Sequence, residues 1–159
     1  VEREGLLLRG LRLLPVEDWQ QQYKECRCAA DSMDLVIADA AYSSTTTDMG
    51  VATGTDFGGP CTFLFHAQCD LTPADGLAGN AASVQWVSQY PEEVERLLPS
   101  NSIFLPLPQG LRSEPPEGLG DRKMFQFFSR FLWDYQRLLP SNTCLLPLPQ
   151  GMRSEPPEG

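Results

Sequence analysis

The side chains with the most versatile chemistry in this sequence are five cysteines and a single histidine. Four of the cysteines form two pairs, Cys26 with Cys28 and Cys61 with Cys69. Paired cysteines in zinc sites usually have about two to four residues between them, and neither pair has this spacing. On a helix, moreover, Cys26 and Cys28 would point about 200° apart. The sequence therefore predicts no metal site, and it leaves open disulfides between the two pairs, in an oxidising compartment, or ordinary buried thiols.

His66 lies at the end of an aromatic stretch that begins at Phe63. A histidine can act as general base for a cysteine nucleophile, which would pair His66 with Cys61 or Cys69 in a thiol enzyme. On a strand, however, residues 61 and 66 point to opposite faces of the sheet. The sequence contains no phosphate-binding loop, dinucleotide fingerprint, zinc-protease motif or nucleophile elbow. We therefore expect a structural histidine, no catalytic residue and no cofactor.

The charge of the chain limits its partners. Its 159 residues include 12 Lys and Arg against 21 Asp and Glu, for a formal net charge of -9. Such an acidic surface repels phosphate backbones, so we expect no nucleic-acid partner. No apolar run approaches the ~20 residues that a membrane-spanning helix needs. Residues 1–95 hold 15 acidic and five basic side chains, whereas the rest carries +1, which predicts a boundary near residue 95.

A repeat occupies much of the C-terminal part of the sequence. Residues 96–118 and 137–159 agree at 19 of 23 positions. Each copy contains five prolines, which remove amide donors and fix φ, so neither copy is expected to form a helix or a central strand. The Leu-Pro-Leu-Pro stretch followed by Gln-Gly is typical of polyproline II that ends in a turn. Because both copies are richer in leucine than disordered linkers are, we expect two extended arms that contact other protein surfaces.

Helical periodicity dominates the other secondary-structure signals. Apolar residues recur every three or four positions from Val16 to Ala40, which predicts a helix over about 16–41. Short helices are expected near 81–89 and after Pro91, a strand over 61–67, and a loop over the Ser-, Thr- and Gly-rich residues 43–60. The expected fold is mainly α with extensive irregular, Pro-rich chain, in which an acidic helical unit (1–95) carries two polyproline-II-like arms (96–118 and 137–159).

An aromatic segment between the two arms carries the strongest predicted interaction surface. Residues 119–136 are expected to form an amphipathic helix that extends to about residue 139 and is apolar over most of its circumference. Such a helix is buried in a core, docked in a partner's groove, or placed against lipid or pigment. The residues expected to bind partner subunits lie on this helix and on the arms: Phe104, Leu105, Leu107, Phe125, Phe128, Trp133, Leu145, Leu146 and Leu148.

These features together predict a non-enzymatic accessory subunit of a large assembly, peripheral to an organellar membrane complex such as a photosystem or a respiratory complex. Its repeated arms would bind neighbouring subunits twice and so raise avidity. One alternative is an autonomous lumenal or secreted binding domain, stabilised by disulfides among the paired cysteines Cys26, Cys28, Cys61 and Cys69. A thiol enzyme that uses His66 is the third hypothesis.

Overall fold

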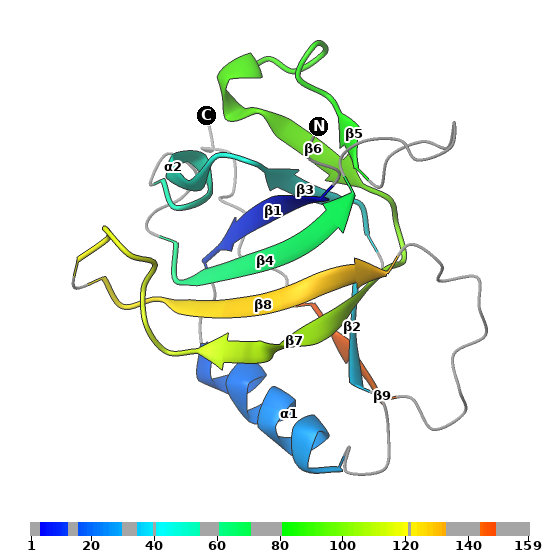
Figure 1. Cartoon of the computed structure of the whole chain (residues 1–159), viewed down its shortest axis with the longest axis vertical. Helices are drawn as coiled ribbons and strands as arrows, with labels where there is room; N and C mark the ends of the chain where they lie inside the picture. Colours follow the sequence, from blue (N-terminus) through cyan, green and yellow to red (C-terminus); the bar gives the residue numbers. More distant parts are fainter. Residues whose placement is uncertain are drawn as a thin grey trace, which may run out of the picture.

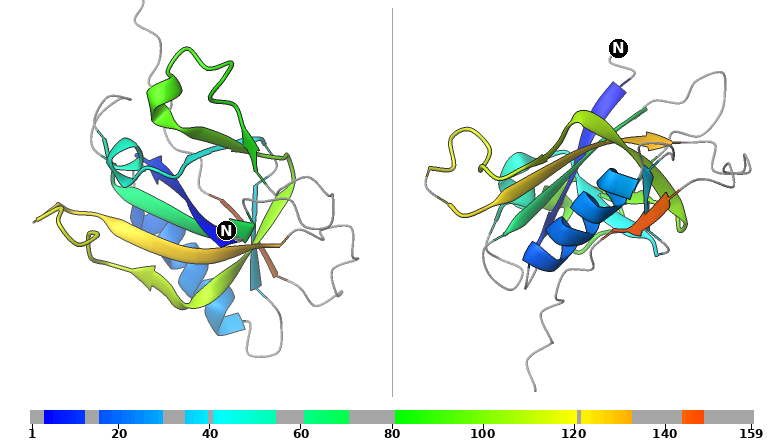
Figure 2. Two further views of the ribbon diagram at one scale, coloured as in Figure 1. Left: turned by 45° about the horizontal axis from the view of Figure 1, so that its top comes forward. Right: turned by 90° about the horizontal axis from the view of Figure 1, so that it is seen from below.

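The computed structural model of the chain describes residues 4–12, 16–29, 35–39, 41–54, 61–70, 81–120, 122–132 and 144–148. Within them, nine strands join in one sheet in the order β5-β6-β3-β1-β4-β8-β7-β2-β9. The sheet is strongly curled, so that β2 runs at a steep angle to β8 (Figure 1). The helix α1 lies against one face of this sheet (Figure 2).

The elements of the described residues are as follows. The strands are β1 (Glu4–Leu11), β2 (Leu35–Asp39), β3 (Ser43–Thr46), β4 (Phe63–Asp70), β5 (Ala82–Ser83), β6 (Glu95–Leu98), β7 (Ser102–Arg112), β8 (Phe125–Leu132) and β9 (Cys144–Pro147). The helices are α1 (Val16–Ala29), α2 (Met49–Ala52) and the 3-10 turn η2 (Pro91–Glu93).

The centre of the sheet is built from β1, β4 and β8. Strand β1 pairs antiparallel with β4 along their whole lengths, from Glu4 opposite Asp70 to Leu11 opposite Phe63. Strand β8 then pairs parallel with β4, with Phe63 opposite Phe125. The expected strand over 61–67 is therefore confirmed as β4, and its aromatic residues suit a pleated, buried surface.

The main core lies between this central sheet and α1. The ring of Trp19 meets the rings of Phe63 and Phe127 edge to face, with centroid distances of 5.2 Å in both cases. Tyr23, about one turn further along α1, makes the same kind of contact with Phe127 at 5.2 Å. The indole nitrogen of Trp19 also donates to the carbonyl oxygen of Pro147 in β9 at 3.0 Å, so α1 is bound to the sheet at two places.

The expected mainly α fold is wrong, because strands joined in one sheet make up about half of the described chain, whereas its helices are α1, the four-residue α2 and the turn η2. The helix expected over 16–41 is confirmed only from Val16 to Ala29, and residues 35–39 form β2 instead. All five side chains of β2 are at least partly buried, so its sequence reads as a continuous apolar run that also fits helical spacing. No helix in the described ranges is long and apolar enough to cross a membrane.

The aromatic helix expected over 119–136, and extending to about 139, is also wrong. Its residues 125–132 form β8, which lies between β4 and β7 in the sheet. Its phenylalanines at positions 125, 127, 128 and 131 do not alternate strictly, and their spacing also fits one face of a helix. Residues 133–143 lie outside the described ranges, and Trp133 is among them.

The first repeat copy is a pair of sheet strands, β6 and β7, and not a polyproline-II-like arm. Its prolines fit the sheet because β2 pairs with β7 only between Ser102 and Phe104. Pro106 therefore lies beyond that pairing, at the start of an irregularity in the β7–β8 register that ends at Leu111. The boundary expected near residue 95 falls at the start of β6.

The second repeat copy contributes β9, which pairs parallel with β2, whereas β7 pairs antiparallel with it. The two copies thus flank the same strand and run in opposite directions. Leu146 and Leu148 of the second copy are buried in this chain's own core. Residues 149–159 lie outside the described ranges.

Candidate functional site

Strand β3 carries four consecutive hydroxyl side chains, Ser43, Ser44, Thr45 and Thr46, and lies between β1 and β6. Ser43, Thr45 and Thr46 are buried, and Ser44 is exposed. The loop expected to begin at residue 43 is therefore wrong here. A buried hydroxyl group nearly always has a hydrogen-bond partner. The partners of these four hydroxyl groups therefore show which segments β3 is bonded to.

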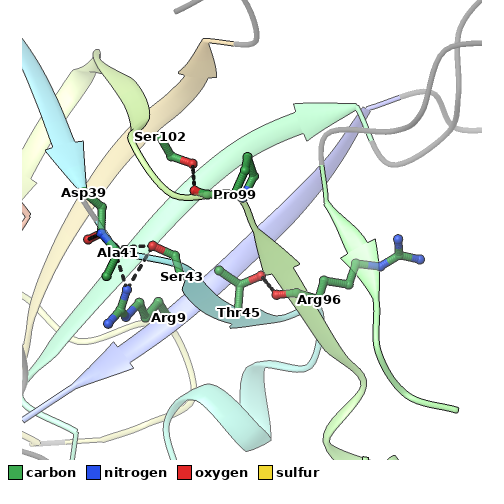
Figure 3. Close-up of polar contacts among 8 residues, drawn as sticks. All are labelled: Arg9, Asp39, Ala41, Ser43, Thr45, Arg96, Pro99 and Ser102. Carbon is green, nitrogen blue, oxygen red and sulfur yellow. Dashed lines mark hydrogen bonds and ion pairs between the residues drawn. The ribbon is translucent and has the colours of Figure 1, made fainter. Parts of the chain in front are cut away.

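Ser43 belongs to a buried ionic cluster with Arg9 of β1 and Asp39 of β2 (Figure 3). One guanidinium nitrogen of Arg9, Nη1, lies 2.9 Å from Asp39 Oδ2 and 3.0 Å from Ser43 Oγ. The Ser43 hydroxyl itself donates to Asp39 Oδ2, and the Ala41 amide donates to Asp39 Oδ1 at 3.1 Å. The Asp39 side chain is inaccessible to solvent, while that of Arg9 is 17% exposed.

Gly10 allows β1 to approach α2 closely beside Arg9. A Cβ atom at this position would lie 1.7 Å from the carbonyl oxygen of Ala52, which no side chain can tolerate. This contact fixes β1 against α2 at the residue that follows Arg9.

The next three hydroxyl groups of β3 hold the segment that leads from η2 into β6. Ser44 Oγ donates to Glu95 Oε1 at 2.5 Å. Thr45 Oγ1 donates to the Arg96 carbonyl oxygen and Thr46 Oγ1 to that of Glu93, each at 2.6 Å. Glu93 and Glu95, separated by one residue, are thereby attached to β3, Glu93 through its backbone carbonyl and Glu95 through its carboxylate.

The residue between these carboxylates has an unusual backbone. Val94 adopts the left-handed conformation at φ 50° and ψ 46°, which a β-branched residue rarely does. Such a conformation costs about 1–3 kcal/mol and persists only where the surroundings impose it. Here the Thr46 hydrogen bond and the bond from Val94 N to the Pro91 carbonyl oxygen, at 3.3 Å, impose it. Strained residues of this kind cluster at functional sites.

The connection from β5 to η2 exposes apolar side chains. Trp86 is 85% exposed, and Val87 and Tyr90 are also exposed. The connection is nevertheless ordered by its own hydrogen bonds, because the Val87 amide donates to the Val84 carbonyl at 3.0 Å and Gln85 Nε2 donates to the Pro91 carbonyl at 2.8 Å. An exposed tryptophan on an ordered connection is typical of a contact surface.

The groups bonded to β3, the Arg9 guanidinium and the Glu95 carboxylate, indicate which substrates this region could bind. A partly exposed arginine binds phosphate groups. A carboxylate held by a hydroxyl group stabilises a sugar that becomes positively charged during cleavage of a glycosidic bond. No group of three or more metal-ligating side chains occurs among the described residues. A partly exposed guanidinium and a hydroxyl-bound carboxylate suit a substrate that carries both a phosphate group and a glycosidic bond.

The residues expected to bind partner subunits lie elsewhere, on β7, β8 and β9. Phe104 is buried in the main core together with Leu146 and Leu148. Leu105, Leu107, Phe125 and Phe128 are half-buried, and the side chain of Leu145, like Trp133, is outside the described set. Contact of the half-buried residues with a partner stays a prediction.

The thiols also lie apart from β3. Cys26, Cys61 and Cys69 are present as thiols, and the side chain of Cys28 is outside the described set. Cys69 and Cys26 pack with the main core, whereas Cys61 packs with Leu8, Ala52, Leu64 and Met124 on the other face of the sheet. Burial raises the pKa of the Cys61 thiol, which disfavours the nucleophilic thiolate.

His66 is a buried residue of β4, as expected of a structural histidine. Its Nε2 lies 2.8 Å from Gln126 Oε1, and its ring stacks on Phe128 at a centroid distance of 4.2 Å. Burial lowers the pKa of His66, although the hydrogen bond with Gln126 opposes this shift. The segment that was expected to form a helix against lipid or pigment contributes strand β8 instead, which pairs with β4 beside His66.

The sequence-based interpretation missed Arg9, Asp39, Glu93, Glu95 and the β3 hydroxyl groups. Two signals could have revealed them. One is the Ser-Ser-Thr-Thr run directly after an apolar stretch, and the other is Glu-Val-Glu directly before Arg-Leu-Leu-Pro. Neither is a motif for a known cofactor, so only their juxtaposition in the sheet gives them meaning.

No family model matches the sequence, and no curated protein matches it. Solved structures do resemble the fold. HopU1, an ADP-ribosyltransferase of Pseudomonas syringae pv. Tomato, superposes with a TM-score of 0.56 at 19% identity, covering 81% of this chain and 46% of its own. Plx2a, an ADP-ribosyltransferase toxin of Paenibacillus larvae, superposes with a TM-score of 0.54 at 17% identity, and the match covers 83% of this chain and 63% of Plx2a. The ADP-ribosyltransferase Vis of Vibrio splendidus, solved in complex with agmatine, superposes with a TM-score of 0.52 at 16% identity. This match covers 96% of this chain and 59% of Vis.

This chain has the ADP-ribosyltransferase fold. It spans between 46% and 63% of the length of these three proteins. The likeness contradicts the expected non-enzymatic subunit of a photosystem or respiratory complex, since the structural neighbours are toxins and effectors with enzymatic activity. Exoenzyme S of Pseudomonas aeruginosa, which shares the fold at a TM-score of 0.50, was solved in complex with human 14-3-3 protein beta. A protein partner is thus compatible with this fold.

Proposed function

We propose that this chain is an ADP-ribosyltransferase, which transfers ADP-ribose from NAD+ to an acceptor. The observation that carries the proposal is the attachment of both Arg9 and Glu95 to the start of β3 in a chain with this fold. Consecutive hydroxyl groups, on Ser43 and Ser44, bind the arginine and the carboxylate respectively. The arginine and the carboxylate are thereby attached to neighbouring residues of β3, and the likeness of the fold to ADP-ribosyltransferases supports a role for both in binding NAD+.

The transfer breaks the bond between C1 of the ribose and the nicotinamide nitrogen. Its electron pair goes to the nicotinamide ring, which leaves as a neutral molecule, and the sugar carbon becomes cationic. The Glu95 carboxylate stabilises this developing charge, and the Ser44 hydroxyl group orients it. The Arg9 guanidinium binds the pyrophosphate.

The acceptor then supplies the electron pair for the new bond at the sugar carbon and loses a proton. Glu93, two residues before Glu95, takes this proton. The crystal structure of Vis with agmatine shows that a guanidine compound binds a protein of this fold. The exposed Trp86 and Tyr90 favour an acceptor group carried on a protein surface.

The test measures nicotinamide release and modification of agmatine by the purified chain in the presence of NAD+. Glu95→Gln keeps the size of the side chain and its hydrogen bond with Ser44, but removes the negative charge. We expect the rate to fall about 100- to 1,000-fold, as when one preorganised electrostatic group is removed from an active site. The matched control is Glu92→Gln, the same change at an exposed residue of η2, which should leave the rate within about twofold. A wild-type chain without NAD+ cleavage, or equal effects of the two substitutions, would refute the proposal.

A further inference from the structure

Asp39 is a carboxylate with no access to solvent, at the end of β2. Three strands separate β2 from β1 in the sheet, yet Asp39 Oδ2 lies 2.9 Å from Arg9 Nη1 of β1. The curl of the sheet, together with the direct passage of the chain from β2 to β3, brings the two residues together (Figure 3). The ion pair therefore joins two parts of the sheet that share no backbone hydrogen bond in the described residues.

Burial of a charge is unfavourable unless other groups compensate for it. Asp39 has this compensation on both oxygens, since Oδ2 meets Arg9 and Ser43 and Oδ1 accepts from the Ala41 amide. An apolar pair of similar volume would often give equal or greater stability. A buried ionic cluster of this kind calls for a reason other than stability.

The reason lies in how Arg9 is held. Among the described residues, its contacts to Asp39 and to Ser43 are both made by the single nitrogen Nη1. The opposite edge of the guanidinium, formed by Nε and Nη2, takes part in neither contact, and the side chain is 17% exposed. That edge presents two parallel N–H groups, which is the geometry that binds a phosphate oxygen pair.

We propose that Asp39 is a positioning residue: it fixes Arg9 by one nitrogen so that the other edge of the guanidinium faces the pyrophosphate of NAD+. This inference rests on the proposed function. An arginine has many rotamers of similar energy, and Asp39 removes that freedom before the substrate binds. Asp39 does not touch the substrate, and acts on binding through Arg9 alone.

The first test compares Asp39→Asn with wild type in steady-state kinetics and in calorimetric titration with ADP-ribose. The amide keeps the shape but turns a donor toward Arg9, so Arg9 loses its fixed position. We expect KM for NAD+ to rise about tenfold or more and ADP-ribose affinity to fall equally, because supporting residues of a site typically contribute about 10- to 100-fold. Turnover at saturating NAD+ should change much less. Asp48→Asn is the matched control, since Asp48 only caps α2 and asparagine caps equally well.

The second test is a double-mutant cycle with Arg9→Gln. If Asp39 acts through Arg9, Asp39→Asn should raise KM no further in the Arg9→Gln background. A purely structural Asp39 would instead lower thermal stability and give additive effects. Should Asp39→Asn fail to fold, Asp39→Glu retains the charge but moves the carboxylate by one methylene, and the same rise in KM is expected.

The outcomes separate this inference from the proposed function. An active wild type with an unchanged KM in Asp39→Asn or Asp39→Glu, or with additive effects in the cycle, would overturn the role of Asp39 and leave the proposed function intact. A wild type that neither cleaves NAD+ nor binds ADP-ribose would overturn both.

Discussion

Strands β3 and β6 near one end of the sheet and strands β4 and β8 at its centre are both extended and largely buried, but they bury different chemistry. At the centre, Phe63, Phe65 and Phe127 have almost no exposure, and Phe63 and Phe127 contact the aromatic residues of α1. In the β3–β6 region, the hydroxyl groups of β3, three of them on buried residues and one on an exposed residue, bond carboxylates and backbone carbonyls, and each of them has a hydrogen-bond partner.

This difference between the apolar centre and the polar β3–β6 region suggests that the centre stabilises the fold and that the β3–β6 region serves the function. Apolar burial stabilises the centre by about 1.5–3 kcal/mol for each large side chain, without directional demands. Hydrogen bonds between buried polar groups contribute only about 0.5–1.5 kcal/mol each, but they fix the direction of every partner. We therefore expect substitutions at the centre to affect unfolding, and those at β3 to affect activity. The following predictions test this division, in order of their expected effect on the free energy of unfolding.

The largest effect on stability is expected from Phe127→Ala. Phe127 is fully buried and contacts the rings of Trp19, Tyr23 and Phe65, so its removal leaves a cavity. The free energy of unfolding should fall by about 3–5 kcal/mol, measured by urea denaturation. Phe125→Ala, two residues away on the same strand but only half-buried, should cost clearly less. Equal losses from the two substitutions would show that β8 is not packed as described.

A much smaller loss of stability and a larger loss of activity are expected from Ser44→Ala. Ser44 is exposed and donates a single hydrogen bond, to Glu95, so stability should fall by no more than about 1 kcal/mol. The rate of NAD+ cleavage should fall about tenfold or more, because Glu95 is no longer oriented. Ser83→Ala in β5, at another exposed serine, should change neither quantity. If Ser44→Ala unfolds the chain or leaves the rate unchanged, the division between the two regions fails.

The sequence predicts the centre of the molecule in part. The helix from residue 16 and the strand at 61–67 follow from local pattern, because α1 has one apolar face and β4 is short and aromatic. Strands β2 and β8 could not be told from helices, since their short apolar stretches lack the strict alternation that identifies a strand. In β7, the prolines argued against a sheet, yet they fall where β2 no longer pairs with it.

The site was less predictable than the fold. Arg9 and Asp39 meet only because the sheet curls, and no local pattern encodes a contact across three intervening strands. Glu93 and Glu95 read as acidic residues at the start of a short helix, and η2 is indeed a helical turn over Pro91–Glu93. Their role depends on the hydroxyl groups of β3, about 50 residues earlier in the chain.

The centre contains one polar exception, His66, which should make stability depend on pH. Gln126 Nε2 donates to the Glu114 carbonyl, so Gln126 Oε1 accepts from a neutral His66, whose Nδ1 is buried without a partner among the described residues. Burial lowers the pKa of folded His66 below its ordinary value of 6.5, so the unfolded chain binds the proton more readily. The contribution to stability is therefore complete above pH 6.5 and is lost as the pH falls through the lowered pKa. Denaturation between pH 5 and 8 should show this loss for wild type and not for His66→Gln; parallel curves would contradict it.

The smallest effect on stability is expected at Trp86, which belongs to neither buried region. Its side chain is 85% exposed, so Trp86→Ala should change the free energy of unfolding by less than about 0.5 kcal/mol. If Trp86 contacts a protein acceptor beside Glu93, its removal should weaken modification of a histone mixture, used as an arginine-rich protein probe, by about 30-fold, which corresponds to the ~2 kcal/mol typical of an interface tryptophan. Modification of agmatine should be unaffected, because a small guanidine cannot reach both Trp86 and the reacting sugar. Val87→Ala, also exposed on the same connection, is the control and should have a smaller effect. An equal decrease for histone and agmatine would place Trp86 in the machinery of NAD+ cleavage instead, and the aromatic connection would then belong with β3 rather than form a surface of its own.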